Sequence, residues 1–173
     1  MFSDWGLSWG GWLDNRRGEW WLLAQLLLIT AHLLPPWPAP VVWGLNIWPR
    51  PVVIVGVLLL LGGLVMAAQA FAALGSSLSP LPAAKEGNRL ICRGPYQRCR
   101  HPMYQAVLLC SLGVVLALGS LLHLLLLLGL VAVLGGKARR EECSLLLLHP
   151  TYAAYRSSTP AIAARLPWLD WRE

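Results

Sequence analysis

The sequence predicts an all-α integral membrane protein with about four transmembrane helices, and three observations support this prediction. Of the 173 residues, 57% are hydrophobic and only 13% are charged, whereas an average soluble domain contains about 25% charged residues. Leucine-rich runs such as residues 58–61 and 124–128 contain no charge. A helix needs about 20 apolar residues to cross a bilayer, so this length leaves room for a few crossings but for no large soluble domain.

The amino-terminal half predicts an interfacial segment and two membrane helices. Residues 1–19 are rich in tryptophan, which prefers the headgroup layer, so we expect this segment to lie in the interface. Residues 20–36 form an apolar run that ends in two prolines, and its apolar part would only marginally span a bilayer. Residues 51–74 are long enough to span and begin with a proline, which the first turn of a helix tolerates.

The carboxy-terminal half predicts a tight helical hairpin. Residues 103–136 are apolar almost throughout, with an interruption at Gly119 and Ser120. We therefore expect membrane helices at 102–118 and 120–136, joined by a short turn. Glycines within this stretch would let the two backbones approach closely: Gly113, Gly119 and Gly129.

Residues 137–173 are expected to form a cytoplasmic segment that completes a single domain over residues 1–173. This segment reads as a helix continuing from the membrane and broken at Pro150. If both termini face the cytoplasm, Arg50 alone of the 14 Lys and Arg residues lies outside, as the positive-inside rule requires. The net charge of +6 is then explained by basic membrane margins, and no nucleic-acid partner is expected because no nucleic-acid-binding motif is present.

The stretch GPYQRCRHPMY at residues 94–104 is the first candidate site. A residue before proline is disfavoured in helical conformation and proline suits the first helical position, so His101 should cap a helix that begins at Pro102. This predicts an exposed helix amino terminus, where free amides, Arg98 and Arg100 could bind a carboxylate or phosphate. Alternatively, the arginines contact only lipid headgroups.

Glu141 and Glu142 form the second candidate site. Adjacent carboxylates suit ribose hydroxyls or a cationic amino group, although they could equally be solvated charges paired with Lys137 or Arg139 at helical spacing. No metal site is predicted, because Cys92, Cys99 and His101 lack a fourth ligand and tight spacing. His32 and His123 are weaker candidates, as ionisable groups within apolar runs or as polar ends at the outer interface.

These motifs, taken in order, resemble those of the isoprenylcysteine carboxyl methyltransferase family and the related phospholipid methyltransferases. That family has a Gly-x-Tyr and Arg-His-Pro-x-Tyr segment before a helical hairpin, then a basic residue and a Glu-Glu pair. The likeness covers about residues 74–167. The matching residues are Gly94, Pro95, Tyr96, Arg100, His101, Pro102, Tyr104, Lys137, Glu141 and Glu142. Cys99, Cys143 and the stretch LLLLHPTY depart from the family pattern.

The resemblance implies a small helical membrane methyltransferase that binds S-adenosylmethionine in a cytoplasm-facing pocket, in the plasma membrane if the protein is bacterial. The cofactor-binding residues would be Tyr96, His101, Pro102, Tyr104, Glu141 and Glu142. A carboxylate or thiolate acceptor would need no general base, and we expect Arg100 or Arg140 to orient an anionic acceptor.

The identity of the acceptor stays open at this point. A prenylated cysteine, a phospholipid amine, a small thiol and a quinone-like lipid all fit, each as a membrane-associated or lipidic partner. Two other functions also stay open. One is an NADPH-dependent membrane reductase of the sterol-reductase type, and the other is a non-catalytic membrane protein with a vestigial pocket.

Overall fold

The structure, a computed structural model, describes residues 15, 18–40, 48–75 and 90–172. Within these residues every regular element is a helix, so the predicted all-α class is confirmed for the described part of the chain. The elements are α2 (Glu19–Ala31), α3 (Arg50–Leu74), the 3-10 helix η4 (Gly94–Gln97), α4 (Pro102–Leu118), α5 (Leu121–Leu148) and α6 (Tyr152–Ser158). Most of the predicted interfacial segment lies outside the described residues.

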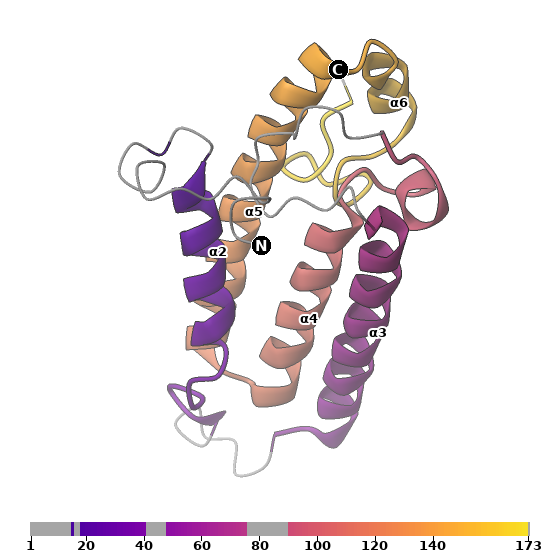
Figure 1. Ribbon diagram of the computed structural model, residues 1–173. Coiled ribbons are helices and arrows are strands. Elements are labelled where there is room, and N and C mark those ends of the chain that lie inside the picture. Colours follow the sequence, from indigo (N-terminus) through magenta and orange to yellow (C-terminus); the bar gives the residue numbers. More distant parts are fainter. Residues whose placement is uncertain (1–14, 16–17, 41–47, 76–89, 173) are drawn as a thin grey trace.

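The helices pack side by side, with α4 next to α3 and α5 between α4 and α2 (Figure 1). The carboxy-terminal end of α5, the amino-terminal end of α4, η4 and α6 lie at the same end of the bundle, shown at the top of Figure 1. The most extensive helix contact is between α3 and α4. The polar motifs of the sequence therefore gather at one end of an apolar bundle.

Two of the described helices, α3 and α5, are long and apolar enough to cross a membrane. Helices α2 and α4 are apolar but have only 13 and 17 residues, so four complete crossings stay a prediction. The predicted run 20–36 is shorter as a helix, because the chain leaves helical geometry after Ala31 and reaches Pro35 and Pro36. Proline lacks the N–H that would continue the helix and restricts the residue before it.

The turn between α4 and α5 falls where the sequence places it, at Gly119 and Ser120. Gly119 adopts a left-handed conformation with φ 60°, which favours glycine. Helix α5 then continues without a break to Leu148, 28 residues in all, or about 42 Å at 1.5 Å per residue. One rigid element therefore carries the apolar run and the polar segment that begins at Lys137.

The expectation that three glycines bring the hairpin helices together is wrong. A Cβ atom added at Gly113 would lie 2.6 Å from the carbonyl oxygen of Gly56 in α3. At Gly129 it would meet Leu28 of α2, and at Gly119 it would meet the Trp48 ring. Small residues therefore serve contacts to the neighbouring helices α3 and α2, whereas longer side chains fill the space between α4 and α5.

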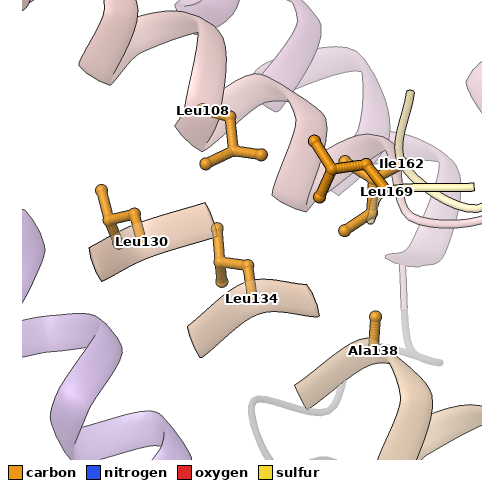
Figure 2. Close-up of a cluster of buried hydrophobic side chains, with 6 residues drawn as sticks. All are labelled: Leu108, Leu130, Leu134, Ala138, Ile162 and Leu169. Carbon is orange, nitrogen blue, oxygen red and sulfur yellow. The ribbon is translucent and has the colours of Figure 1, made fainter. Parts of the chain in front are cut away.

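That space contains the buried hydrophobic core (Figure 2). Its side chains come from α4, from α5 and from the chain after α6: Leu108, Leu130, Leu134, Ala138, Ile162 and Leu169. Each fully buried aliphatic side chain of this size contributes about 1.5–3 kcal/mol of burial free energy. The carboxy-terminal segment is therefore anchored between α4 and α5 rather than free in solvent.

His32 and His123 tie the end of α2 to the hairpin. The His32 Nε2 atom lies 2.6 Å from the Ser111 hydroxyl of α4, and its Nδ1 atom lies 2.8 Å from the Leu28 carbonyl. His123 Nε2 lies 3.3 Å from the His32 carbonyl. These bonds satisfy carbonyls that the last turn of a helix leaves without intrahelical partners.

Candidate functional site at the α4–α5 junction

The local sequence explains how residues 100–102, Arg-His-Pro, reach the end of the bundle. We call these three residues the RHP corner. Gly94 opens η4 with a φ of 61°, a conformation that favours glycine, and Pro95 occupies its first turn. The chain then extends through His101, which is the N-cap residue, and α4 begins at Pro102 as predicted. The fixed φ of proline and its missing N–H suit that position.

The amino terminus of α4 is covered, which corrects the prediction that it is exposed. The backbone N–H groups of Arg100 and His101 donate to the carbonyls of Pro160 and Ala161, at 2.9 Å each. His101 is only 6% exposed and Pro102 is buried. The physical reason is the apolar anchor of the carboxy-terminal segment, whose Ile162 side chain packs in the core and brings the preceding carbonyls onto the corner.

Glu142 is the centre of a buried network. Its Oε1 atom accepts from His101 Nε2 at 2.9 Å and pairs with Arg100 Nε at 2.9 Å. Its Oε2 atom accepts from Trp171 Nε1 at 2.8 Å and lies 3.6 Å from Arg156 Nε. Both carboxylate oxygens are thus bonded to the protein, which is what a buried charge requires.

Glu141 has a different environment. Its Oε2 atom accepts a 2.9 Å hydrogen bond from the Tyr104 hydroxyl and lies 3.8 Å from His101 Nδ1, and its side chain is 27% exposed. The rings of Tyr104 and His101 stack with their centroids 5.3 Å apart. Glu141 therefore combines a fixed position with access to a ligand.

The predicted approach of the two motifs is observed. The structure brings Arg100, His101 and Tyr104 of the α4 corner into direct contact with Glu141 and Glu142 of α5. Their role in cofactor binding stays a prediction.

Two other predicted site residues lie on η4 and on α5. Tyr96 is buried in η4, where its carbonyl accepts from the Tyr155 hydroxyl. Burial, together with the nearby Glu141 carboxylate, raises the pKa of the Tyr96 phenol well above its usual value. Arg140 is exposed on α5.

Arg100 is held entirely by the protein. Its guanidinium donates to the carbonyls of Arg156 and Trp171, at 2.5 and 2.9 Å, besides its ion pair with Glu142. The neighbouring Cys99 thiol donates to the Ala161 carbonyl at 3.2 Å. Burial raises the pKa of Cys99 to about 11, although the backbone N–H of His101 and the charge of Arg100 act in the opposite direction. The segment 98–101 is therefore joined to the carboxy-terminal segment along its length.

Sequence reasoning left out several residues of this site. Trp171 and Arg156 lie far along the chain from both motifs, and no local pattern connects them with Glu142. Lys137 was named from the sequence as a possible partner of the glutamates, whereas Gln25, a polar side chain within the apolar run of α2, was not named although its residue type could have indicated it. Lys137 Nζ donates to Gln25 Oε1 at 2.7 Å and lies 5.3 Å from the centroid of the Tyr104 ring.

Comparison with known proteins identifies the family. Residues 51–146 match the model of a family described as phospholipid methyltransferase, a match that covers more than half of the chain. The chain belongs to the phospholipid methyltransferase family. The matched residues of this family member include the RHP corner and both glutamates, whereas α2 and the carboxy-terminal segment lie outside the match.

The chain is also similar to one curated protein over part of its length. The cobalt-zinc-cadmium resistance protein CzcN of Cupriavidus metallidurans is 33% identical to it over 89 residues. The alignment covers 49% of the present chain and 39% of the relative, so the match leaves more than half of the relative's length uncovered. No solved structure matches the chain.

Proposed function

We propose that the protein transfers a methyl group from S-adenosylmethionine to a lipidic acceptor in the membrane. The observation that supports this most directly is the contact between the RHP corner and the glutamate pair, within the residues that match the family model. A polar cluster at the end of an apolar bundle suits a reaction between a water-soluble donor and a lipid-embedded acceptor, because the two reactants can meet only at that boundary.

The residues of the junction fit the donor chemically. When bound, S-adenosylmethionine supplies a methyl group on positively charged sulfur, and it also carries an amino group and ribose hydroxyls. Glu141 offers a partly exposed carboxylate to the cationic or hydroxyl groups, and the Tyr104 ring is an aromatic group next to which a cation is stabilised. Tyr96 and Pro102 would complete the wall of the binding site from η4 and the first turn of α4.

Glu142 would act by positioning. Its two oxygens are bonded by His101, Arg100 and Trp171, so it fixes the imidazole and closes the carboxy-terminal segment over the corner. Arg100 would act in the same way, through the carbonyls it holds. Arg140, which is exposed next to Glu141 on α5, would orient an anionic acceptor.

The experiment is transfer of radiolabelled methyl from S-adenosylmethionine into lipid extracts by the purified full chain in detergent. We expect label in the lipid fraction, and a decrease of about 10-fold or more in Glu141→Gln, because a hydrogen bond to a charged group contributes about 1.5–3 kcal/mol. Cys143→Ser is the matched control, since Cys143 is an exposed neighbour of the glutamates on α5.

Three results would contradict the proposal. The first is the absence of labelled product from any lipid fraction. The second is copurification of NADPH, detected by mass spectrometry, which would indicate the reductase instead. The third is full activity in an Arg100→Ala, Arg140→Ala double variant, which would show that methyl transfer needs neither arginine.

A further inference from the structure

The chain after α6 contains a loop with two unlike faces, residues 162–169. One face is buried, because Ile162 and Leu169 belong to the core between α4 and α5 (Figure 2). The other face is exposed and apolar. Leu166 is 52% exposed and Trp168 is 76% exposed, and the proline between them is exposed as well. Single exposed apolar residues are ordinary, but a contiguous apolar run in water is unfavourable, so we expect this face to contact a partner.

The height of the loop along α5 indicates which partner. The Trp168 carbonyl oxygen lies 3.7 Å from a Cβ atom added at Gly135. Residues 121–136 of α5 contain no Lys, Arg, Asp or Glu, so Gly135 is near the end of a charge-free stretch. The first exposed charge on α5 is Arg139, four residues or about 6 Å further along the helix axis. Trp168 therefore lies beside the apolar part of a helix that is long enough to cross a membrane, close to its polar end.

A second tryptophan lies at the same height, on the helix that packs against α5 from another direction. A Cβ atom added at Gly136 would lie 2.5 Å from the Trp21 ring of α2, and the adjacent Trp20 is 58% exposed. Tryptophan gathers at the boundary between membrane and water, because its ring is apolar and its N–H is polar. Tryptophans from two separate segments, next to consecutive residues of α5, therefore mark the level of that boundary.

The loop is also able to leave water at low cost, because it bonds its own backbone. The N–H groups of Ile162 and Ala163 donate to the Leu169 carbonyl, at 2.8 and 3.1 Å, and the Leu169 N–H donates to the Leu166 carbonyl at 2.8 Å. A backbone polar group that leaves water without a partner is costly. The exposed face is preceded by Arg165, an exposed basic residue that suits anionic lipid headgroups.

We propose that the exposed face of the 162–169 loop, formed by Leu166, Pro167 and Trp168, inserts into the boundary between headgroups and acyl chains of a lipid bilayer. The leaflet is the one at the polar end of the bundle. Part of the segment 137–173 thus returns to the membrane surface. The anchor fixes the height of the carboxy-terminal segment, which covers the RHP corner, relative to the bilayer. This inference does not depend on methyl transfer.

Photocross-linking of the full chain in phosphatidylcholine–phosphatidylglycerol vesicles tests the insertion. The photoreactive residue p-benzoylphenylalanine is placed at position 168 in one variant and, in the control, at Ser157, an exposed residue of α6. Mass spectrometry after illumination measures the fraction of the chain that carries covalently bound lipid. We expect roughly 10-fold more lipid adduct, or a larger excess, at position 168, because a side chain inserted at the boundary touches acyl chains and one held in water does not.

Limited proteolysis in the same vesicles tests the insertion with natural side chains. Trypsin cleaves after Arg165, where the exposed face begins, and after Arg93, the exposed residue before η4. Because η4 lies at the same end of the bundle (Figure 1), the ratio of the two cleavage rates cancels the orientation of the chain in the vesicles. Combining Leu166→Ser with Trp168→Ser should raise the ratio of Arg165 to Arg93 cleavage about 10-fold, since the loop loses its apolar contact with the bilayer.

Leu147→Ser is the matched control for the proteolysis. Leu147 is 88% exposed, but it lies beyond the charged residues of α5, 12 residues or about 18 Å from Gly135 along the helix. Its replacement should leave the cleavage ratio unchanged. An increase as large as that of the double variant would show that any lost exposed leucine has this effect.

Three results would overturn the inference. The first is an equal amount of lipid adduct at positions 157 and 168, and the second is an unchanged cleavage ratio in the folded double variant. The third is cross-linking of position 168 to a second copy of the chain, which would assign the loop to a protein contact. If the double variant fails to fold, the two cross-linking positions decide the matter. No measurement uses S-adenosylmethionine, so failure of the proposed function would leave these results unaffected.

Discussion

The two faces of α4 are built in opposite ways. Towards α3 the contact is between backbones, with Gly113 against Gly56 and Cys110 against Gly63. Towards α5 the contact is between side chains, apolar at Leu108 and charged at the Arg100–His101 corner. The first face admits no additional atom, whereas the second is assembled from groups that could exchange a protein partner for a ligand. From this difference we propose that function lies at the α4–α5 junction and that the α3–α4 contact gives structural support.

The largest expected effect comes from filling the α3–α4 contact. In Gly113→Leu the new side chain would begin 2.6 Å from the Gly56 carbonyl and 2.7 Å from the Leu60 backbone nitrogen, and neither backbone atom can move without shifting a helix. We expect a loss of about 5 kcal/mol or more, beyond the roughly 1–3 kcal/mol typical of overpacking, because backbone atoms rather than side chains would have to move; thermal unfolding in detergent measures it. Gly62→Ala is the control, because nothing lies within 4 Å of its added Cβ atom, and it should be neutral or slightly stabilising. Equal stability of the two variants would show that the helices are not in backbone contact.

The next effect is expected at the junction itself. Glu142→Gln leaves Arg100 buried without its carboxylate and weakens the bond to His101, and loss of one partner of a buried ion pair costs about 3–5 kcal/mol. Because the Trp171 indole also bonds to Glu142, the carboxy-terminal segment should loosen and become more sensitive to limited proteolysis. Thermal unfolding and proteolysis measure both effects.

Glu141→Gln is the matched comparison for this variant. The Glu141 side chain is partly exposed and bonded by a neutral hydroxyl, so its stability should change by about 1 kcal/mol or less while methyl transfer falls. The reverse order of stabilities would exchange the positioning and ligand-binding roles proposed for the two acids.

The sequence was informative wherever a local rule applies. Proline and glycine chemistry predicted where α4 begins and where the hairpin turns, and hydrophobic runs predicted α3 closely. Family motifs predicted which polar residues meet, because Arg100, His101, Glu141 and Glu142 lie in short segments at the ends of one hairpin. Partners that are distant along the chain were not predictable. Trp171 reaches Glu142 only because Leu169 and Ile162 are buried between α4 and α5, and no residue near Trp171 encodes that fold-back.

The prediction of which helices the glycines contact was wrong for the same reason. Gly113 is a helix-contact residue by its type, but the sequence cannot say which helix it faces. The prediction that the α4 amino terminus is exposed was also wrong. It rested on the helix alone, whereas carbonyls of the carboxy-terminal segment cover that terminus.

The smallest effect concerns the chemistry of one thiol and tests whether the carboxy-terminal segment stays closed over the corner. Cys99 is 3% exposed, and burial raises its pKa to about 11. A thiol at pKa 11 is only about 0.1% thiolate at pH 8, and the thiolate is the reactive form. Because the folded pKa lies above the ordinary value of 9.0, the thiolate fraction of Cys99 should still be rising at pH 10, where an ordinary thiol levels off.

Alkylation of single-cysteine variants between pH 7 and 10, followed by mass spectrometry, measures this, with exposed Cys143 as the accessible reference. We expect Cys99 to react at least about 10-fold more slowly than Cys143 at pH 8 and to approach the Cys143 rate in Glu142→Gln, where the segment loosens. A Cys99 that reacts as fast as Cys143 in the unmodified background would mean that the segment opens readily, and the α4 terminus would then be available to an anion as the sequence alone predicts.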